Sequence, residues 1–194
     1  MPVKRKSKRK SNIKKIVKSM IAGSQETKTF IQELANTPLT NVGQNYDITS
    51  LAQGVGQNQR LGNSYKVTSF KLKGAVFNGG TDDLCRVIIY IPKNPQVLMP
   101  TDTSMQSTDP VDLDKFTVLS DRLIPVSDHG PGCRLYNKVC LFNKGRRNGL
   151  HVQFSDALAT SITKNRLMVY MCSFSSAAPH PSFKGWWRVY FKDA

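Results

Sequence analysis

A run of cations at the start of the chain has the clearest chemical potential. Nine lysines and arginines fall within the first 18 residues, and no acidic residue precedes Glu26. Cationic side chains at this density neutralise phosphates, and a block of like charges repels itself unless it meets a polyanion. We therefore predict that nucleic acid is bound by Lys4, Arg5, Lys6, Lys8, Arg9, Lys10, Lys14, Lys15 and Lys18.

The cationic run also divides the chain. Of the 28 Lys and Arg in the 194 residues, 19 lie after the run and are offset by 13 Asp and Glu. This contrast predicts a nucleic-acid-binding arm, residues 1–27, followed by one folded domain, residues 28–194. Residues 4–10 also have the composition of a nuclear import signal, which makes a nuclear import receptor a second predicted partner. Phosphate contacts alone leave DNA and RNA both open.

Residue patterns for catalysis are missing from the sequence. No HExxH, GxSxG or phosphate-binding loop occurs, and the cysteines form no CxxC pair. We therefore predict no enzyme activity, no catalytic residue and no cofactor, with free thiols in a reducing compartment. The residues considered were His129, His151, His180, Cys85, Cys133, Cys140 and Cys172.

Two other polar groups have weaker patterns. Six aspartates could supply oxygen ligands for a hard cation, but they lack EF-hand spacing, so we predict a solvated acidic loop and no metal site. They are Asp102, Asp109, Asp112, Asp114, Asp121 and Asp128. The turn at 144–149 carries three cations, which suit either contact with a polyanion or a plain solvated turn.

Short strands must position these residues. Runs of β-branched, aromatic and alternating residues, separated by turn signals, predict eight strands, and helical periodicity is nearly absent from this region. The predicted strands are 28–35, 65–78, 84–91, 116–126, 134–142, 150–154, 166–174 and 186–192, with 37–63 as a long surface loop. Connections of about 29 and 24 residues suit crossings between sheets. The fold class is therefore all-β, an eight-stranded antiparallel jelly-roll sandwich with a basic N-terminal arm.

Period-two alternation predicts which side chains face the core. In the last strand, Trp187, Val189 and Phe191 share the core face, while Trp186 lies on the other face with Arg188, Tyr190 and Lys192. The run 167–172 is apolar on both faces, which predicts a central strand whose second face is covered by another subunit. Trp186 is accordingly a candidate subunit contact.

The arm contains one apolar stripe. Ile13, Ile16, Val17, Met20 and Ile21 recur at helical spacing, and so short a helix needs a partner. The predicted partner is the same helix of neighbouring subunits, which makes Ile16 and Met20 candidate subunit contacts. A membrane-active amphipathic segment and an accidental pattern in a linker are the alternatives. No apolar run approaches the roughly 20 residues of a spanning helix, so we predict no stable membrane insertion.

A glycine- and glutamine-rich loop precedes the second predicted strand. Its glycines allow close backbone approach, and Arg60 could clamp a carboxylate or carbonyls, in a structural role or at a subunit contact. Nucleic acid and solvent are its other possible partners. Residues 53–62 have the pattern Q-G-x-G-x-x-Q-R-[IL]-G and lead into the strand residues 67–74.

This loop, the basic start and the last strand resemble capsid proteins of small circular Rep-encoding single-stranded DNA viruses. The resemblance implies a single jelly roll, an icosahedral shell of sixty copies, an interior arm on a single-stranded DNA genome, and assembly in the host nucleus before release in the virion. Residues 92–114 have no counterpart in this resemblance. The alternatives are a cellular nucleic-acid-binding β-domain, the coat protein of a small RNA satellite virus, and a cupin-type enzyme, which the missing histidine-rich metal motif disfavours.

Overall fold

The computed structural model describes residues 26–101, 108–128, 132–142 and 149–193, and these residues form strands and loops. Ten strands follow one another along the chain. They are β1 (Lys28–Pro38), β2 (Gln44–Asp47), β3 (Ser64–Phe77), β4 (Asp83–Pro92), β5 (Phe116–Val126), β6 (Cys133–Leu141), β7 (Leu150–Phe154), β8 (Ile162–Lys164), β9 (Met168–Ser173) and β10 (Ser182–Asp193).

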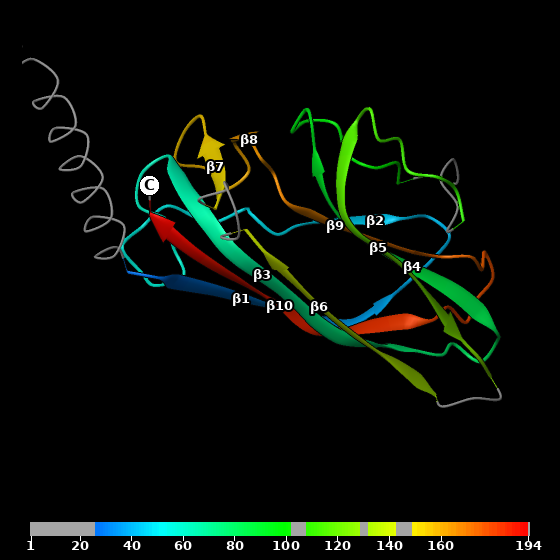
Figure 1. Cartoon of the computed structure of the whole chain (residues 1–194). Helices are drawn as coiled ribbons and strands as arrows, with labels where there is room; N and C mark the ends of the chain where they lie inside the picture. The colour runs from blue at the N-terminus through cyan, green and yellow to red at the C-terminus, as the bar shows by residue number, and fades with distance from the viewer. Residues whose placement is uncertain (1–25, 102–107, 129–131, 143–148, 194) are drawn as a thin grey trace, which may run out of the picture.

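The strands make two antiparallel sheets that pack face to face (Figure 1). One sheet has the order β1-β10-β3-β7-β8, with β6 also paired to β3, and the other has the order β2-β9-β4-β5. The first strand therefore lies beside the last, and the chain crosses repeatedly between the sheets. This strand order is that of a jelly roll, so the predicted fold class is confirmed.

The strand count is ten, whereas eight were predicted. All eight predicted strands are present, and β2 and β8 are additional. β2 lies inside the predicted loop 37–63; its residues are mostly polar, and it becomes a strand by pairing with β9. β6 and β7 both pair with β3, one along Ser69–Phe77 and the other along Ser64–Val67, so they occupy one strand position of the sandwich.

The main core fills the space between the two sheets. Trp187 is 1% exposed, and Val189 and Phe191 are fully buried in the same layer. The outward residues that alternate with them along the strand are Trp186, Arg188 and Tyr190, all of them partly exposed. The alternation predicted for this strand is therefore confirmed.

A second apolar core lies on the opposite face of the β2-β9-β4-β5 sheet. β9 is central, as predicted, but its second face is covered by the chain itself and not by another subunit. The connection between β4 and β5 folds back so that Met99 and Phe116 pack with Ile88, Tyr90 and Tyr170. The Tyr90 hydroxyl donates to Asn45 Oδ1 at 2.7 Å and accepts from the Met99 amide at 3.2 Å, which anchors this loop.

Candidate nucleic-acid interface

The outer face of β3 and β10 gathers cations and aromatic rings, and we call it the basic–aromatic face. These two strands are neighbours in the middle of the first sheet, and each alternates core residues with outward ones. Register places Arg188 opposite Lys71, Trp186 opposite Lys73, and Lys192 opposite Lys66. The face consists of Lys66, Lys71, Lys73, Lys184, Trp186, Arg188, Tyr190 and Lys192.

Positive charge on this face is poorly compensated. Arg188 and Lys71 are like charges directly opposite each other, an arrangement that destabilises a sheet. Among the described residues, the ion pairs join Lys28, Arg86, Lys115 and Arg166 to aspartates, and none involves Arg188 or Lys71. The acid Glu33 lies opposite Trp186 on β1 and is exposed. A concentration of cations of this kind is suited to an anionic ligand.

The rings of the face are held among its cations. Arg188 Cζ lies 5.4 Å from the centroid of the Trp186 ring and 5.9 Å from that of Tyr190. Lys71 Nζ lies 5.6 Å from the Trp186 centroid. Arg188 Nη1 donates to the Tyr190 hydroxyl at 3.1 Å, whereas its buried Nε has no hydrogen-bond partner. The arrangement combines stacking surfaces with cations within cation–π distance.

The basic arm joins the domain at the same sheet. All nine of its predicted phosphate-binding cations lie outside the described residues, as do Ile16 and Met20. The described chain enters β1 at Lys28, which pairs with Phe191, and Thr29 pairs with Tyr190. In Figure 1 the start of β1 lies beside the end of β10. The arm is therefore tethered next to one end of the basic–aromatic face.

Arg60 lies inside the protein, where it holds two loops together. Its side chain is fully buried, and it donates to the carbonyls of Leu51, Gly62, Asp156 and Leu158. The guanidinium also stacks 3.7 Å above the centroid of the Phe154 ring. The predicted clamp on carbonyls is thus formed within one chain. Because no part of the side chain is exposed, Arg60 is not available as a subunit contact or a nucleic-acid ligand.

The other residues considered from the sequence, which are aspartates, cysteines, histidines and the cations of one turn, do not form a common site among the described residues. Asp121 pairs with Arg86 at 2.6 Å and Asp112 pairs with Lys115 at 2.9 Å. In the described ranges, no three His, Cys, Asp or Glu side chains are grouped to hold a metal ion. Cys85 and Cys172 are buried free thiols, and burial raises the pKa of Cys85 to about 12. Asp102, His129 and the cations at 144–147 lie outside the described residues.

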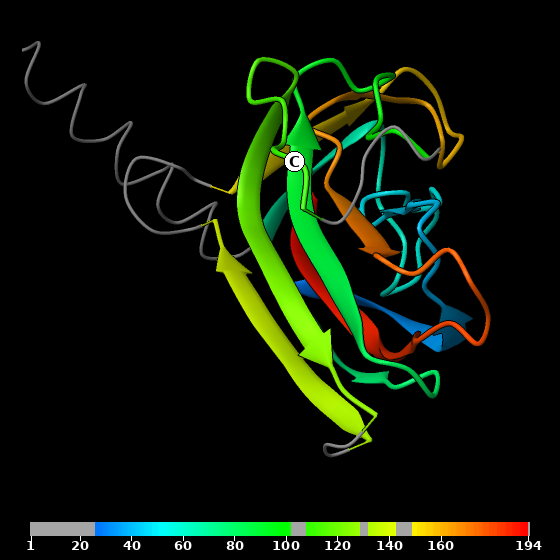
Figure 2. The same cartoon turned by 90° about the vertical axis from the view of Figure 1, so that its right-hand side faces the viewer.

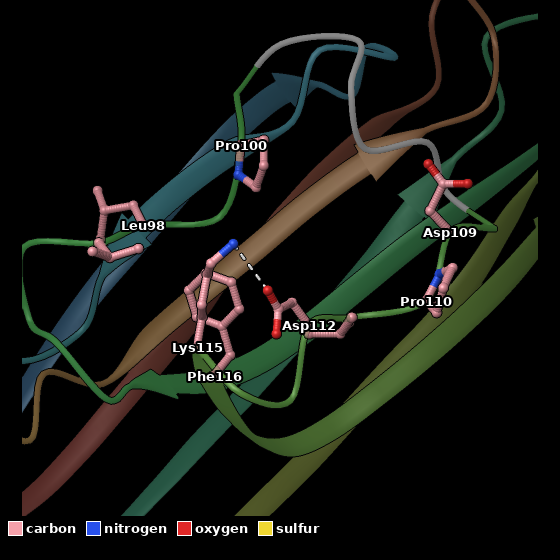
Figure 3. Close-up of a pocket in the computed structure, with 9 residues that line it drawn as sticks. Leu98, Pro100, Asp109, Pro110, Asp112, Lys115 and Phe116 are labelled. Carbon is pink, nitrogen blue, oxygen red and sulfur yellow. Dashed lines mark ion pairs between the residues drawn. The ribbon is translucent and has the colours of Figure 1, made fainter.

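A cleft of about 290 Å³ opens at the loop that covers the second core (Figure 3). Its walls are mainly apolar, with Leu98, Pro100, Pro110 and Phe116 among them, and the Asp112–Lys115 ion pair lies at its side. Figure 2 shows β4 and β5 side by side, in agreement with their antiparallel pairing.

His151 lies beside the basic–aromatic face and is expected to make its binding of polyanions depend on pH. It pairs with Lys66 across β7 and β3, and its pKa is lowered by burial first and then by Lys66 and Lys164. The folded protein thus favours neutral His151, and this contribution to stability is lost as the pH falls from about 6.5 through the lowered pKa. A bound polyanion would offset both lysines, so we expect it to raise the pKa of His151.

This effect predicts tighter binding of polyanions as the pH falls through the pKa of His151 in the complex, with uptake of a proton. The measurement is an NMR titration of the histidine ring protons with and without a saturating oligonucleotide. A His151→Gln variant assigns the resonance and should bind with a weaker pH dependence. An unchanged His151 pKa in the complex would contradict the prediction.

Sequence reasoning identified the outward Trp186, Arg188, Tyr190 and Lys192 of the last strand but not the lysines of β3 that lie beside them. Lys71 and Lys73 flank Leu72, and this alternation of cations with a core residue was a usable signal. What the pattern could not show is that β3 pairs with β10 in the register that puts Lys71 beside Arg188.

Similarity to known proteins is found among solved structures. No protein-family model and no curated protein matches the sequence. Among solved structures, one from Desmodium yellow mottle tymovirus is similar at 11% identity, with a TM-score of 0.47, over 86% of this chain and 85% of that chain. We base the jelly-roll assignment on the strand order alone. In the part of the chain that the structure describes, no helix is long and apolar enough to span a membrane.

Proposed function

We propose that this protein is a viral coat protein that assembles into a closed shell and packages nucleic acid through its basic arm. One observation carries the proposal: an arm with nine cations is tethered to a jelly-roll domain beside a sheet face that carries six more. The finer assignment, an icosahedral shell of sixty copies around single-stranded DNA assembled in the host nucleus, rests on the resemblance of residues 53–62 and 67–74 to coat proteins of that kind.

Packaging on this proposal is electrostatic and independent of sequence. Sixty arms with nine cations each would bring about 540 positive charges to the interior, enough to neutralise a similar number of phosphates. A genome of a few thousand nucleotides would need more, and the cations of the basic–aromatic face are suited to supply part of it. This requires the face to point towards the interior of the shell.

Electron microscopy of the purified full chain tests the coat function. Uniform closed particles are the expected result, and a monodisperse monomer under all assembly conditions would overturn the proposal. Nuclease digestion of the extracted contents then separates the alternatives. DNA supports the proposed virus type, RNA supports a coat protein of a small RNA virus, and monomers that bind nucleic acid support a cellular β-domain.

Deletion of residues 2–18 should produce shells that are empty or filled at random. The deletion removes all nine arm cations and leaves β1 and the core unchanged. The nucleic-acid content of purified particles is measured by the ratio of their absorbance at 260 and 280 nm, and its identity by sequencing the nucleic acid extracted from them. A matched variant in which the nine cations become glutamine keeps the length of the arm. Normal genome content in either variant would contradict the role of the arm.

A further inference from the structure

We propose that the basic–aromatic face is a binding site for single-stranded nucleic acid, in which Trp186 stacks on an unpaired base and the adjacent cations contact the flanking phosphates. This inference deepens the proposed function and rests on it for the presence of a packaged nucleic acid. It assigns to Trp186 a ligand contact in place of the subunit contact predicted from the sequence.

The surroundings of Trp186 favour a polyanion over a protein surface. Lys71 and Arg188 lie within 6 Å of its ring centroid. Its direct partners on the two neighbouring strands are Lys73 on β3 and Glu33 on β1, so three cations surround it against one acid. A second copy of this chain docked here would bring identical cations together or require an acidic patch. A phosphate strand instead supplies negative charge at each step and oxygen acceptors for the guanidinium of Arg188, a residue on the partly exposed outer face.

The spacing of the face suits an extended strand of nucleotides. Trp186 and Tyr190 lie on the same side of β10, four residues apart, which separates their Cα atoms by about 13 Å. Arg188 Cζ lies near both rings, which limits the distance between the two ring centroids to about 11 Å. Neighbouring cations are about 5 Å apart across the sheet and about 7 Å apart along each strand. The two rings are therefore far enough apart to meet different bases, with cations between them for the intervening phosphates.

The aromatic rings distinguish an unpaired strand from a duplex. In a duplex the faces of the bases are stacked on one another, so a flat sheet surface reaches only phosphates and groove edges. A single strand exposes base faces, and sheet surfaces with aromatic residues use these faces for stacking that tolerates any sequence. The basic–aromatic face should therefore prefer single-stranded to double-stranded nucleic acid of equal length.

The test compares binding of oligodeoxythymidylate and of a duplex of equal length to the full chain, by fluorescence anisotropy at high salt. High salt suppresses the binding of nucleic acid by the arm, because phosphate contacts weaken steeply with salt concentration. Trp186→Ala should weaken binding of the single strand by roughly 5- to 150-fold, the alanine-scan range for one stacked base, and leave the duplex nearly unaffected. Trp186→Phe should retain most of the affinity.

A second readout reports on the ring itself. Trp187 is buried and serves as an internal background, so quenching of tryptophan fluorescence by the oligonucleotide should come from Trp186 and vanish in Trp186→Phe. Equal losses for single strand and duplex, or no loss in Trp186→Ala, would overturn the inference. A different result would overturn the coat proposal, namely that the purified full chain forms no closed particles in electron microscopy. If the Trp186→Ala variant forms closed particles and binds the single strand with wild-type affinity, only the stacking inference is refuted, and the coat proposal stands.

Discussion

Replacing Arg60 with methionine is expected to lower the free energy of unfolding by about 3–5 kcal/mol, because four backbone carbonyls lose their guanidinium donor. The guanidinium joins the loop 51–62 to the loop 156–158, which lies almost 100 residues further along the chain. Methionine fills a similar apolar volume against Phe154, but it leaves four carbonyl oxygens without this donor. Each buried acceptor left unpaired costs about 1–3 kcal/mol. The Leu51 and Gly62 carbonyls account for most of the loss, because those of Asp156 and Leu158 also accept from the Ser161 hydroxyl.

Urea denaturation followed by circular dichroism measures this effect. Arg60→Lys provides the matched comparison, because it keeps the charge but lacks the planar fork that reaches several carbonyls at once. We expect Arg60→Lys to recover less than half of the lost stability. A loss below about 1 kcal/mol for Arg60→Met would show that the four contacts contribute little to the folded state.

Replacing Trp187 with alanine is also expected to cost about 3–5 kcal/mol, the range for truncation of a large buried aromatic side chain. Trp187 is almost fully buried between the sheets, with its ring centroid 6.1 Å from that of Tyr46 on β2. Its removal leaves a cavity at the contact between the two layers. Trp187→Phe should cost less, because it keeps most of the apolar contact and removes an indole N–H that has no hydrogen-bond partner.

The neighbouring tryptophan provides the control for this prediction. Trp186→Ala removes the same side chain from the partly exposed outer face of the same strand, and it should cost about 1 kcal/mol or less. Urea denaturation of both variants gives the two free energies. Equal destabilisation by the two substitutions would contradict the assignment of core and outer faces on β10.

The sequence by itself determined the local features of this protein. Alternation with period two needs only neighbouring residues, so it identified eight strands and the inward side of Trp187. Long connections between strands then favoured a jelly roll over an up-and-down barrel, and the strand order agrees. The basic arm is a property of composition, so its prediction as a polyanion-binding segment needs no structure.

The tertiary structure alone decided which distant segments meet. β2 has weak strand propensity and exists because β9 offers it an edge, while the loop after β4 covers a face that had been assigned to another subunit. Two of the contacts described above join residues about 100 positions apart. One is the hydrogen bonding of Arg60 to the carbonyls of the loop 156–158, and the other is the pairing of Lys71 with Arg188. Alternation reports the face of a strand but carries no information about its partner or register, and those two choices create the basic–aromatic face.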